Sequence, residues 1–346
     1  MSGIAIVGAG SAGLAAAYEL RTEPINVTVF EKSRGYGGRA ATRGRYGHRY
    51  DHGAPYFSAP THRVRRLVTA HLPTAGLVEI GREIGGFTSA GDRVQAALVD
   101  ASPRWTYRQG ISTLGKLLAR QSRATFRTET RIAAVQREGG SWALKTDEGR
   151  TEQGFDAVLL TPPAPQTASM LETERASRTV NELQDAVAAV EYDAQFAVVL
   201  AYDRRIGRPE NVLGLRSTDG EHPLNWIGFE TVKPGHVREG HSLLVVHTAP
   251  HWTAERVDED PDAYVPDVKG WAEEILDESL QHPVWYDTQR WRYAVPVGQI
   301  DPAPVAAART EGLFLAGDAV AGTGRVGAAL QNGLEAADQL REYRSW

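Results

Sequence analysis

The distribution of hydrophobic and polar residues predicts the same kind of structure at the two ends of the chain. The apolar run at residues 4–7 predicts a buried strand, residues 14–20 a helix, and the β-branched run at 26–30 a second strand. Near the other end, residues 312–318 predict a buried strand and residues 326–340 a helix. Buried strands that alternate with helices are typical of a parallel sheet covered by helices. We therefore expect an α/β fold in which both ends of the chain belong to one unit.

The segments that follow the opening are less regular. Residues 32–60 are rich in glycine and arginine and are expected to form loops. Helices are expected at 61–72, where Thr61 can cap the first turn, and at 113–121. A strand is expected at 77–80 and a turn at Gly85–Gly86. Short strands at 131–135, 142–145 and 157–160, with glycine turns between them, predict a small β unit.

From residue 164 to about 300 the chain is richer in strands and in Trp, Tyr and His. Strands are expected at 194–202, 224–230, 242–248 and 285–296, and helices at 173–190 and 265–280. This pattern predicts an antiparallel sheet with helices, an α+β domain inserted into the α/β unit. The expected nucleotide-binding domain comprises residues 1–75, 101–163 and 300–346, and the expected substrate domain comprises 76–100 and 164–299.

Composition excludes several classes of function. The net charge is −5 without a basic stripe, so we expect no nucleic-acid partner. No run reaches the ~18 apolar residues of a membrane span, and no signal peptide is evident, so a soluble cytoplasmic protein is expected. There is no cysteine, which excludes a disulfide, a thiolate nucleophile and a cysteinyl-flavin link. His48 and His52 flank Asp51, but their spacing is poor for a metal, and no metal is expected. The pattern does not indicate an oligomeric state.

A glycine motif lies between the first strand and the first helix. It reads Gly8-Ala9-Gly10-Ser11-Ala12-Gly13. The first glycine permits the turn, the second admits a pyrophosphate, and the third lets helix and strand pack closely. Glu31 ends the second strand, where a carboxylate accepts hydrogen bonds from a ribose diol and repels a 2′-phosphate. The motif and the acid together predict a site for FAD or NAD and not for NADP.

Two further signals point to FAD. Gly37-Gly38-Arg39 follows the acid, and the C-terminal strand ends in Gly317-Asp318. The full set resembles the glutathione-reductase-type FAD fold in its amine oxidase branch. The resemblance implies that Gly37, Gly38 and Arg39 lie along the diphosphate, that Ile132 passes near the adenine, and that Asp318 meets the ribityl or phosphate end. The helix from Val326 would point its N-terminus at the flavin pyrimidine and stabilise negative charge there. Lys32, Ala54 and Arg325 complete the expected set for FAD, which we expect to be bound non-covalently.

Looser segments resemble the renalase family over nearly the whole chain. They are 32–39, 51–57, 109–112, 246–248 and 291–293, although the family usually has glutamine where Pro55 stands. The resemblance implies oxidation of the 2- and 6-dihydro isomers of NAD(P)H to NAD(P)+, with hydride transfer to flavin N5 and reduction of O2 to H2O2. The partners would be a small dinucleotide and O2.

Candidate catalytic residues are Tyr56 and Trp291 as flat walls for a dihydropyridine ring, with His247 and Arg292 as polar contacts. Trp226, Phe57 and Phe229 are further aromatic candidates. For each aromatic a core role is the simpler interpretation, since aromatics fill cores anyway; His247 could be a satisfied core histidine and Arg292 half of a surface ion pair. Two other functions stay open. One is a flavin amine oxidase or desaturase, although none of the five lysines lies in an obvious substrate-domain strand. The other is a non-catalytic FAD-binding redox partner.

Overall fold

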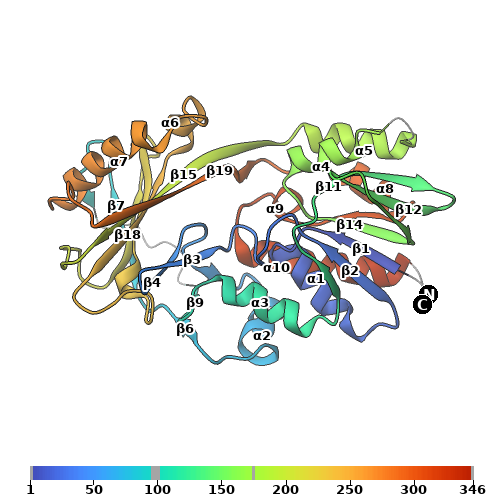
Figure 1. Ribbon diagram of the computed structural model, residues 1–346, viewed down its shortest axis with the longest axis horizontal. Coiled ribbons are helices and arrows are strands. Elements are labelled where there is room, and N and C mark those ends of the chain that lie inside the picture. Colours follow the sequence, from blue (N-terminus) through green and yellow to red (C-terminus); the bar gives the residue numbers. More distant parts are fainter. Residues whose placement is uncertain (1–2, 95–101, 174–175, 344–346) are drawn as a thin grey trace.

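The structure is a computed structural model that describes residues 3–94, 102–173 and 176–343. It has two lobes, each built on its own sheet (Figure 1). The first-lobe sheet is five-stranded and parallel, in the order β10-β2-β1-β14-β20. Its strands are β10 (Thr125–Arg127), β2 (Asn26–Phe30), β1 (Gly3–Val7), β14 (Ala157–Leu160) and β20 (Leu313–Leu315). The prediction that both ends of the chain form one α/β unit is confirmed.

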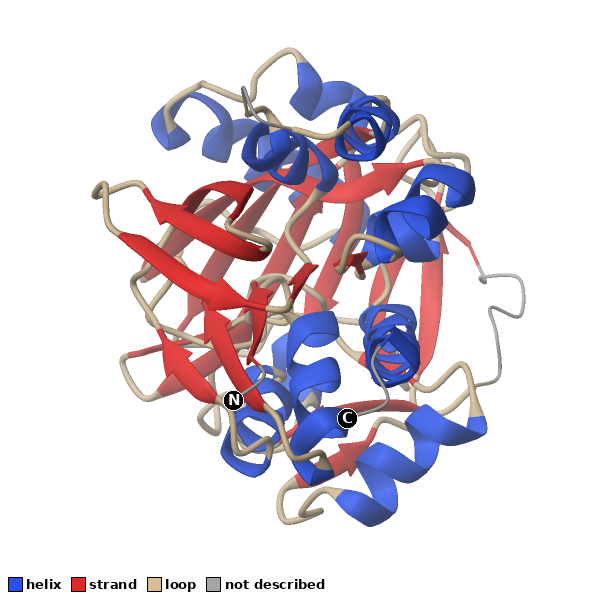
Figure 2. Ribbon diagram, turned by 90° about the vertical axis from the view of Figure 1, so that its right-hand side faces the viewer, coloured by secondary structure: helices blue, strands red, loops and turns tan. Residues whose placement is uncertain are grey.

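Both faces of this sheet are covered, which explains the continuous apolar runs of its strands. In β1, Ile4 and Ile6 belong to one core cluster, and Ala5 and Val7 to another. The first cluster contains the helices α1 (Ser11–Glu19), α3 (Ser112–Gln121) and α10 (Val326–Tyr343). The second contains the antiparallel sheet β11 (Ile132–Glu138), β12 (Ser141–Thr146) and β13 (Thr151–Phe155), with α4 (Ala164–Leu171), α5 (Arg178–Ala188) and α8 (Pro302–Arg309). Figure 2 shows helices on both sides of the strands.

The second-lobe sheet is seven-stranded, in the order β19-β15-β18-β17-β16-β7-β8. Its strands are β19 (Trp285–Val297), β15 (Glu191–Tyr202), β18 (Ser242–Thr248), β17 (Leu224–Phe229), β16 (Val212–Ser217), β7 (Glu83–Phe87) and β8 (Arg93–Val94). All neighbours are antiparallel except β16 and β7, which are parallel. The helices α6 (Pro250–Ala254) and α7 (Pro261–Leu276) cover one face through an apolar cluster. The other face is directed toward the first lobe, and β15 and β19 extend toward that lobe (Figure 1).

Several predicted elements need correction. Residues 157–160 do not belong to the small β unit, because β14 pairs with β1 and β20 in the main sheet. Residues 32–60 are not all loop. They contain the hairpin β3 (Thr42–Arg45) and β4 (His48–Asp51), and β5 (Phe57–Ser58), which pairs with β9 (Arg104–Tyr107) beside β6 (Leu77–Glu79). Gly85 and Gly86 are not a turn but lie in β7. A Cβ on either would stand 2.6 Å from a side chain of a neighbouring segment.

Helix boundaries also differ from the predictions. α7 begins at Pro261, and the Asp260 side chain caps it by accepting from the Asp262 N–H. It ends at Leu276, followed by Asp277 in the left-handed conformation, so it lies about four residues earlier than expected. α5 is shorter than the expected 173–190, of which residues 174–175 lie outside the described residues. The predicted cap at Thr61 is confirmed, since its hydroxyl accepts from the Val64 N–H at the start of α2 (His62–Arg66), which continues into a π-helical turn at Leu67–His71. β16 and α8 were not expected.

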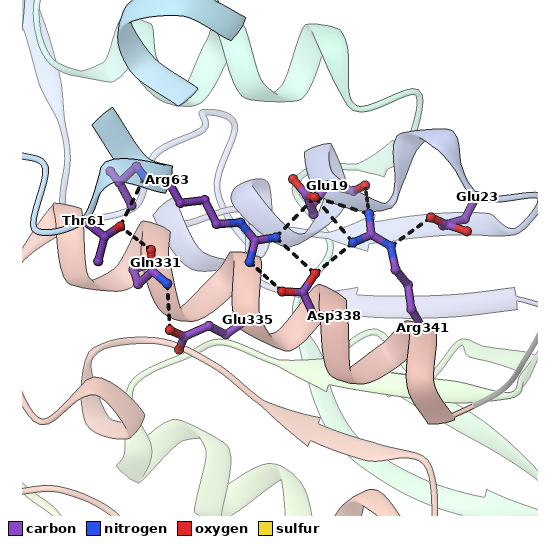
Figure 3. Close-up of polar contacts among 9 residues, drawn as sticks. Glu19, Glu23, Thr61, Arg63, Gln331, Glu335, Asp338 and Arg341 are labelled. Carbon is purple, nitrogen blue, oxygen red and sulfur yellow. Dashed lines mark hydrogen bonds and ion pairs between the residues drawn. The ribbon is translucent and has the colours of Figure 1, made fainter. Parts of the chain in front are cut away.

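A network of ion pairs fastens the C-terminal helix to the start of the chain (Figure 3). Arg63 of α2 lies 3.2 Å from Glu19 and 2.5 Å from Asp338 of α10. Arg341 of α10 lies 2.8 Å from both Asp338 and Glu23. The network ties α1, α2 and α10 together and so fixes the helix whose Gly333 packs against Ala12 of the glycine motif. Among the described residues no helix has both the length and the apolarity to cross a membrane.

Candidate active site

The glycine motif forms a tight turn between β1 and α1. Gly8 has a φ of +101°, a conformation that favours glycine. A Cβ on Gly13 would stand 2.1 Å from the carbonyl oxygen of Gly8, so only glycine allows this close packing of helix on strand. A Cβ on Gly10 would meet nothing within 4 Å, which leaves the space beside the N-terminus of α1 open. Ser11 and Ala12 form the first turn of that helix. The turn therefore has the shape that a diphosphate requires.

The second glycine signal lies directly against the first. Gly37 donates its N–H to the Ala9 carbonyl at 2.8 Å, and Gly37 and Gly10 form a parallel bridge. A Cβ on Gly38 would stand 3.3 Å from the Cα of Gly10. Gly37 and Gly38 have φ values of +109° and +59°. The two loops together make one backbone cradle that side chains would fill.

Glu31 lies at the edge of this cradle. Its carboxylate accepts from the Ala9 and Ser33 N–H groups, both at 2.8 Å. The Glu31 carbonyl accepts from Thr130 at 2.9 Å, which brings the start of β11 at Ile132 close to the acid. The Lys32 ammonium lies near the surface, 3.4 Å from Gln166 Oε1. The predicted ribose end of the site is thus assembled from β2, β11 and the first turn.

Asp318 and Arg39 form the opposite end of the cradle. The Arg39 guanidinium lies 2.5 Å from Asp318 and also donates to the carbonyls of Tyr293 and Ala294. The Tyr192 hydroxyl donates to the other Asp318 oxygen at 3.0 Å. Arg39 was expected to pair with a diphosphate, whereas in this structure its partner is Asp318. Tyr192 is a residue that the sequence did not single out, because nothing local marks its contact with a residue 126 positions away.

The C-terminal helix begins beside this pair. The Gly317 N–H is held by Asn332 of α10 at 2.9 Å. The Arg325 carbonyl accepts from Ala329 and so starts the helix, while the Arg325 side chain is exposed. Val326 packs against the first-lobe core.

The turn at His52–Ala54 connects the cradle to the second lobe. A Cβ on Gly53 would stand 2.0 Å from the Arg39 carbonyl oxygen, to which the Ala54 N–H donates at 3.0 Å. From the other side, Trp291 Nε1 donates to the His52 carbonyl at 3.0 Å. The His247 ring also lies beside the His52 backbone. Two second-lobe side chains therefore lie against a turn that touches the Gly37–Arg39 loop, and Trp291 is hydrogen-bonded to it.

Two of the four catalytic candidates, His247 and Trp291, lie on the face of the second-lobe sheet that is directed toward the first lobe, and Tyr56 packs against this face. His247 is paired across strands with Ala197 and Trp226, and Trp291 with Gln195, so these residues share a face. The Trp226 indole lies over Gly214 and Gly228, where a Cβ would stand 2.4 and 2.6 Å from it. Tyr56 packs against the small apolar cluster that contains Trp226. Arg104 lies 5.5 Å from the Tyr56 ring centroid.

Arg292 is not part of this group. It follows Trp291 in β19 and therefore points to the opposite face, where it forms a half-exposed ion pair with Asp258. Among the other aromatic candidates, Phe57 stacks on Tyr107 in the first-lobe core, and Phe229 belongs to the cluster under α7. The structure therefore shows Arg292 in a surface ion pair and the two phenylalanines in cores, which were the alternative interpretations of these residues.

The histidines on this face are neutral. Burial lowers the pKa of His247 to about 4, and burial also lowers that of His52 to about 4. His247 Nε2 and Trp226 Nε1 are buried and have no hydrogen-bond partner among the described residues. A buried polar atom without a partner is uncommon and calls for an explanation, such as a ligand that completes its bonding.

A buried charged cluster was missed. Lys233 lies just after β17, with Asp51 and Glu230 on either side of its ammonium group and His236 beside Glu230. The local sequence, Glu230-Thr231-Val232-Lys233-Pro234, carries no signal of burial, and the partner Asp51 is 182 residues away.

Comparison with known proteins identifies the family. The model of the flavin-containing amine oxidoreductases matches residues 81–341, and that of an NAD(P)-binding Rossmann-like domain matches residues 6–70. The chain belongs to the flavin-containing amine oxidoreductase family. FAD is accordingly the cofactor of this amine oxidoreductase, and the glycine cradle fits it, since a Cβ on Gly10 would meet nothing within 4 Å and the N-terminus of α1 is open to a diphosphate.

Solved structures show the same fold. A putative protoporphyrinogen oxidase from Exiguobacterium sp. 255-15 superposes with a TM-score of 0.81 at 17% identity, covering 99% of each chain. A putrescine oxidase bound to putrescine superposes with a TM-score of 0.74 at 13% identity, also covering 99% of each chain. A fatty acid isomerase from P. acnes that produces CLA has a TM-score of 0.70 at 13% identity, covering 96% of this chain and 97% of the other. At these identities the likeness concerns the fold alone.

Proposed function

We propose that the protein is a renalase-like FAD-dependent oxidase that acts on the 2- and 6-dihydro isomers of NAD(P)H. The observation that carries the proposal is the neutral, aromatic face formed by Trp291, Trp226, His247 and Tyr56. A dihydropyridine ring is flat and uncharged, and it needs orientation and exclusion of water more than acid–base catalysis. The chemistry that FAD supplies when bound is acceptance of a hydride and delivery of both electrons to O2, which gives H2O2.

The side chains on this face have separate roles in the proposal. Trp291 fixes the His52–Ala54 turn through its Nε1 and offers its ring beside Gly53, whose Cβ position is 3.3 Å from the indole. His247 is neutral and has an unpartnered Nε2, which can hydrogen-bond the carboxamide of the substrate: in one tautomer it accepts from the NH2 group, and in the other it donates to the carbonyl oxygen. Arg104, beside the Tyr56 ring, is our candidate for the phosphates of the substrate.

The acids on this side of the sheet favour a substrate with a neutral ring over a substrate that is a cationic amine. Asp287 pairs with Arg43 at 2.9 Å and accepts from the Tyr50 hydroxyl at 2.7 Å. Asp51 and Glu230 are both bonded to Lys233. A substrate ammonium group would therefore find these carboxylates already neutralised.

One observation favours a second candidate, an oxidase of small amines. Asp193 lies on β15 opposite Val295, where the strands cross between the lobes. Burial raises the pKa of Asp193, as expected for a carboxylate without a cation. An ammonium substrate would supply that cation.

An anaerobic titration of the FAD-loaded protein discriminates the candidates. We expect the visible flavin absorbance to bleach with 2- or 6-dihydro-NAD(P) and to persist with a panel of mono- and diamines. The Trp291→Phe variant should bleach more slowly, and the Asp193→Asn variant should bleach at the wild-type rate. Bleaching by amines that Asp193→Asn abolishes would replace the proposal with the second candidate. A flavin that neither class, nor a polyene, reduces would indicate a redox partner.

A further inference from the structure

The charged cluster behind the His52–Ala54 turn is closed to solvent. Asp51, Glu230, Lys233 and His236 are each at most 2% exposed. The Lys233 ammonium lies 3.0 Å from Asp51 Oδ2 and 2.5 Å from Glu230 Oε1. Asp51 comes from β4, whereas the other three lie in or after the short 3₁₀ turn Glu230–Val232 that follows β17. The cluster therefore joins two segments that are far apart in the chain.

The hydrogen bonds of His236 determine its charge. Its Nδ1 lies 2.7 Å from Glu230 Oε2 and its Nε2 lies 3.0 Å from the Tyr107 carbonyl oxygen. A carboxylate and a carbonyl only accept, so both ring nitrogens must donate and the ring is an imidazolium. Burial alone would lower the pKa of His236, but the hydrogen bond and charge of Glu230 outweigh it and raise the pKa. Two cations then balance two carboxylates, which is the condition for burying four charges.

Asp51 connects the charged cluster to the flavin cradle through its hydrogen bonds. Its carboxylate accepts from Thr42 Oγ1 at 2.7 Å, from the Ile111 N–H at 2.9 Å and from Thr106 Oγ1 at 3.2 Å. The Ile111 contact fixes the start of α3, and a Cβ on Gly115 in that helix would stand 2.9 Å from the backbone of Gly37. The Asp51 N–H in turn donates to Glu230 Oε2 at 3.2 Å. The next residues in the chain are the His52–Ala54 turn itself.

We propose that Lys233 is a positioning residue for the flavin. With Glu230 and His236 it completes a charge-balanced tetrad around Asp51, and the tetrad holds the Gly37–Arg39 loop and the His52–Ala54 turn in register with each other. The proposal rests on the FAD site alone and not on the identity of the substrate. Asp51, Glu230 and His236 offer ligand atoms within 4.8 Å of one another, as in a metal site. The Lys233 ammonium lies between the two carboxylates and takes the place that a metal cation would occupy.

The test compares three variants in the full-length, FAD-reconstituted protein. Lys233→Met removes one cation and leaves the tetrad unbalanced. The double variant Asp51→Asn with Lys233→Met removes one charge of each sign and stays neutral. Ile275→Ala, in the buried cluster under α7, is a destabilising control outside the tetrad. For each variant we measure the melting temperature, the Kd for FAD, and the visible circular dichroism of the bound flavin.

We expect both Lys233 variants to bind FAD at least tenfold more weakly and to alter the flavin dichroism. Ile275→Ala should lower the melting temperature without either effect. If Lys233→Met does not fold, the neutral double variant decides. Wild-type Kd and dichroism in a folded Lys233 variant would overturn the proposal. So would failure of both Lys233 variants to fold while Ile275→Ala folds, because the tetrad would then be purely structural.

Discussion

The buried histidine His247 should make the protein sensitive to acid. Burial lowers its pKa to about 4 in the folded chain, against about 6.5 when the chain is unfolded. Below pH 6.5 the unfolded chain takes up a proton that the folded chain refuses, so stability falls as the pH falls from 6.5 toward 4. The difference of about 2.5 pKa units corresponds to about 3 kcal/mol of the free energy of unfolding, of which about 2 kcal/mol is lost when the pH reaches 5.

The perturbation is His247→Gln, which keeps a hydrogen-bonding side chain and removes the titration. Urea unfolding followed by tryptophan fluorescence, at pH 7.5 and pH 5 with saturating FAD, gives the free energy of unfolding of each form. The wild type should lose about 2 kcal/mol more than the variant over this interval. His62→Gln, at an exposed position in α2, is the matched control and should behave as the wild type. Equal losses in wild type and His247→Gln would refute the claim that His247 is neutral and desolvated.

Three further predictions concern the cradle. Gly13→Ala should prevent folding or FAD uptake, because its Cβ would stand 2.1 Å from the Gly8 carbonyl oxygen, whereas Gly10→Ala should fold and bind FAD weakly. The visible absorbance of the purified proteins distinguishes the two variants, and a yellow, stable Gly13→Ala protein would contradict the packing argument. Tyr192→Phe removes the hydroxyl bonded to Asp318 and should weaken FAD binding by about 0.5–1.5 kcal/mol, as read from the Kd by fluorescence quenching; an unchanged Kd would show that this bond does not order the site. Trp291→Phe keeps an aromatic ring but loses the bond to the His52 carbonyl, so single-turnover flavin reduction should slow. A wild-type rate would remove Trp291 from the site.

The predictable parts of the fold are those that a short stretch of sequence determines by itself. An apolar run buried on both faces, such as 4–7, and glycines that a turn requires, such as Gly8, reveal the parallel sheet and its cofactor motif. The β3–β4 hairpin was missed because its paired residues are mostly polar and show no alternation. Gly85 and Gly86 were misread because a glycine needed for close packing in a strand looks the same as a glycine needed for a turn.

The same distinction applies to the residues of the site. The glycine cradle and Glu31 could be predicted, because backbone shape requires the glycines and the end of a strand positions the acid. Lys233 and Tyr192 were not, because their importance comes from single contacts with Asp51 and Asp318 across more than a hundred residues. Arg292 was misjudged because a one-residue step along a strand reverses the direction of a side chain, and only the pairing of Gln195 with Trp291 settles which of the two faces inward.

The paired strands β15 and β19 also join the two lobes. They run antiparallel over 12 and 13 residues and carry the chain between the lobes. Their pairing is regular except for a register shift between Asp193 and Gln195. Because such an irregularity bends and twists the strands that contain it, it determines the direction in which the ladder leaves the first lobe.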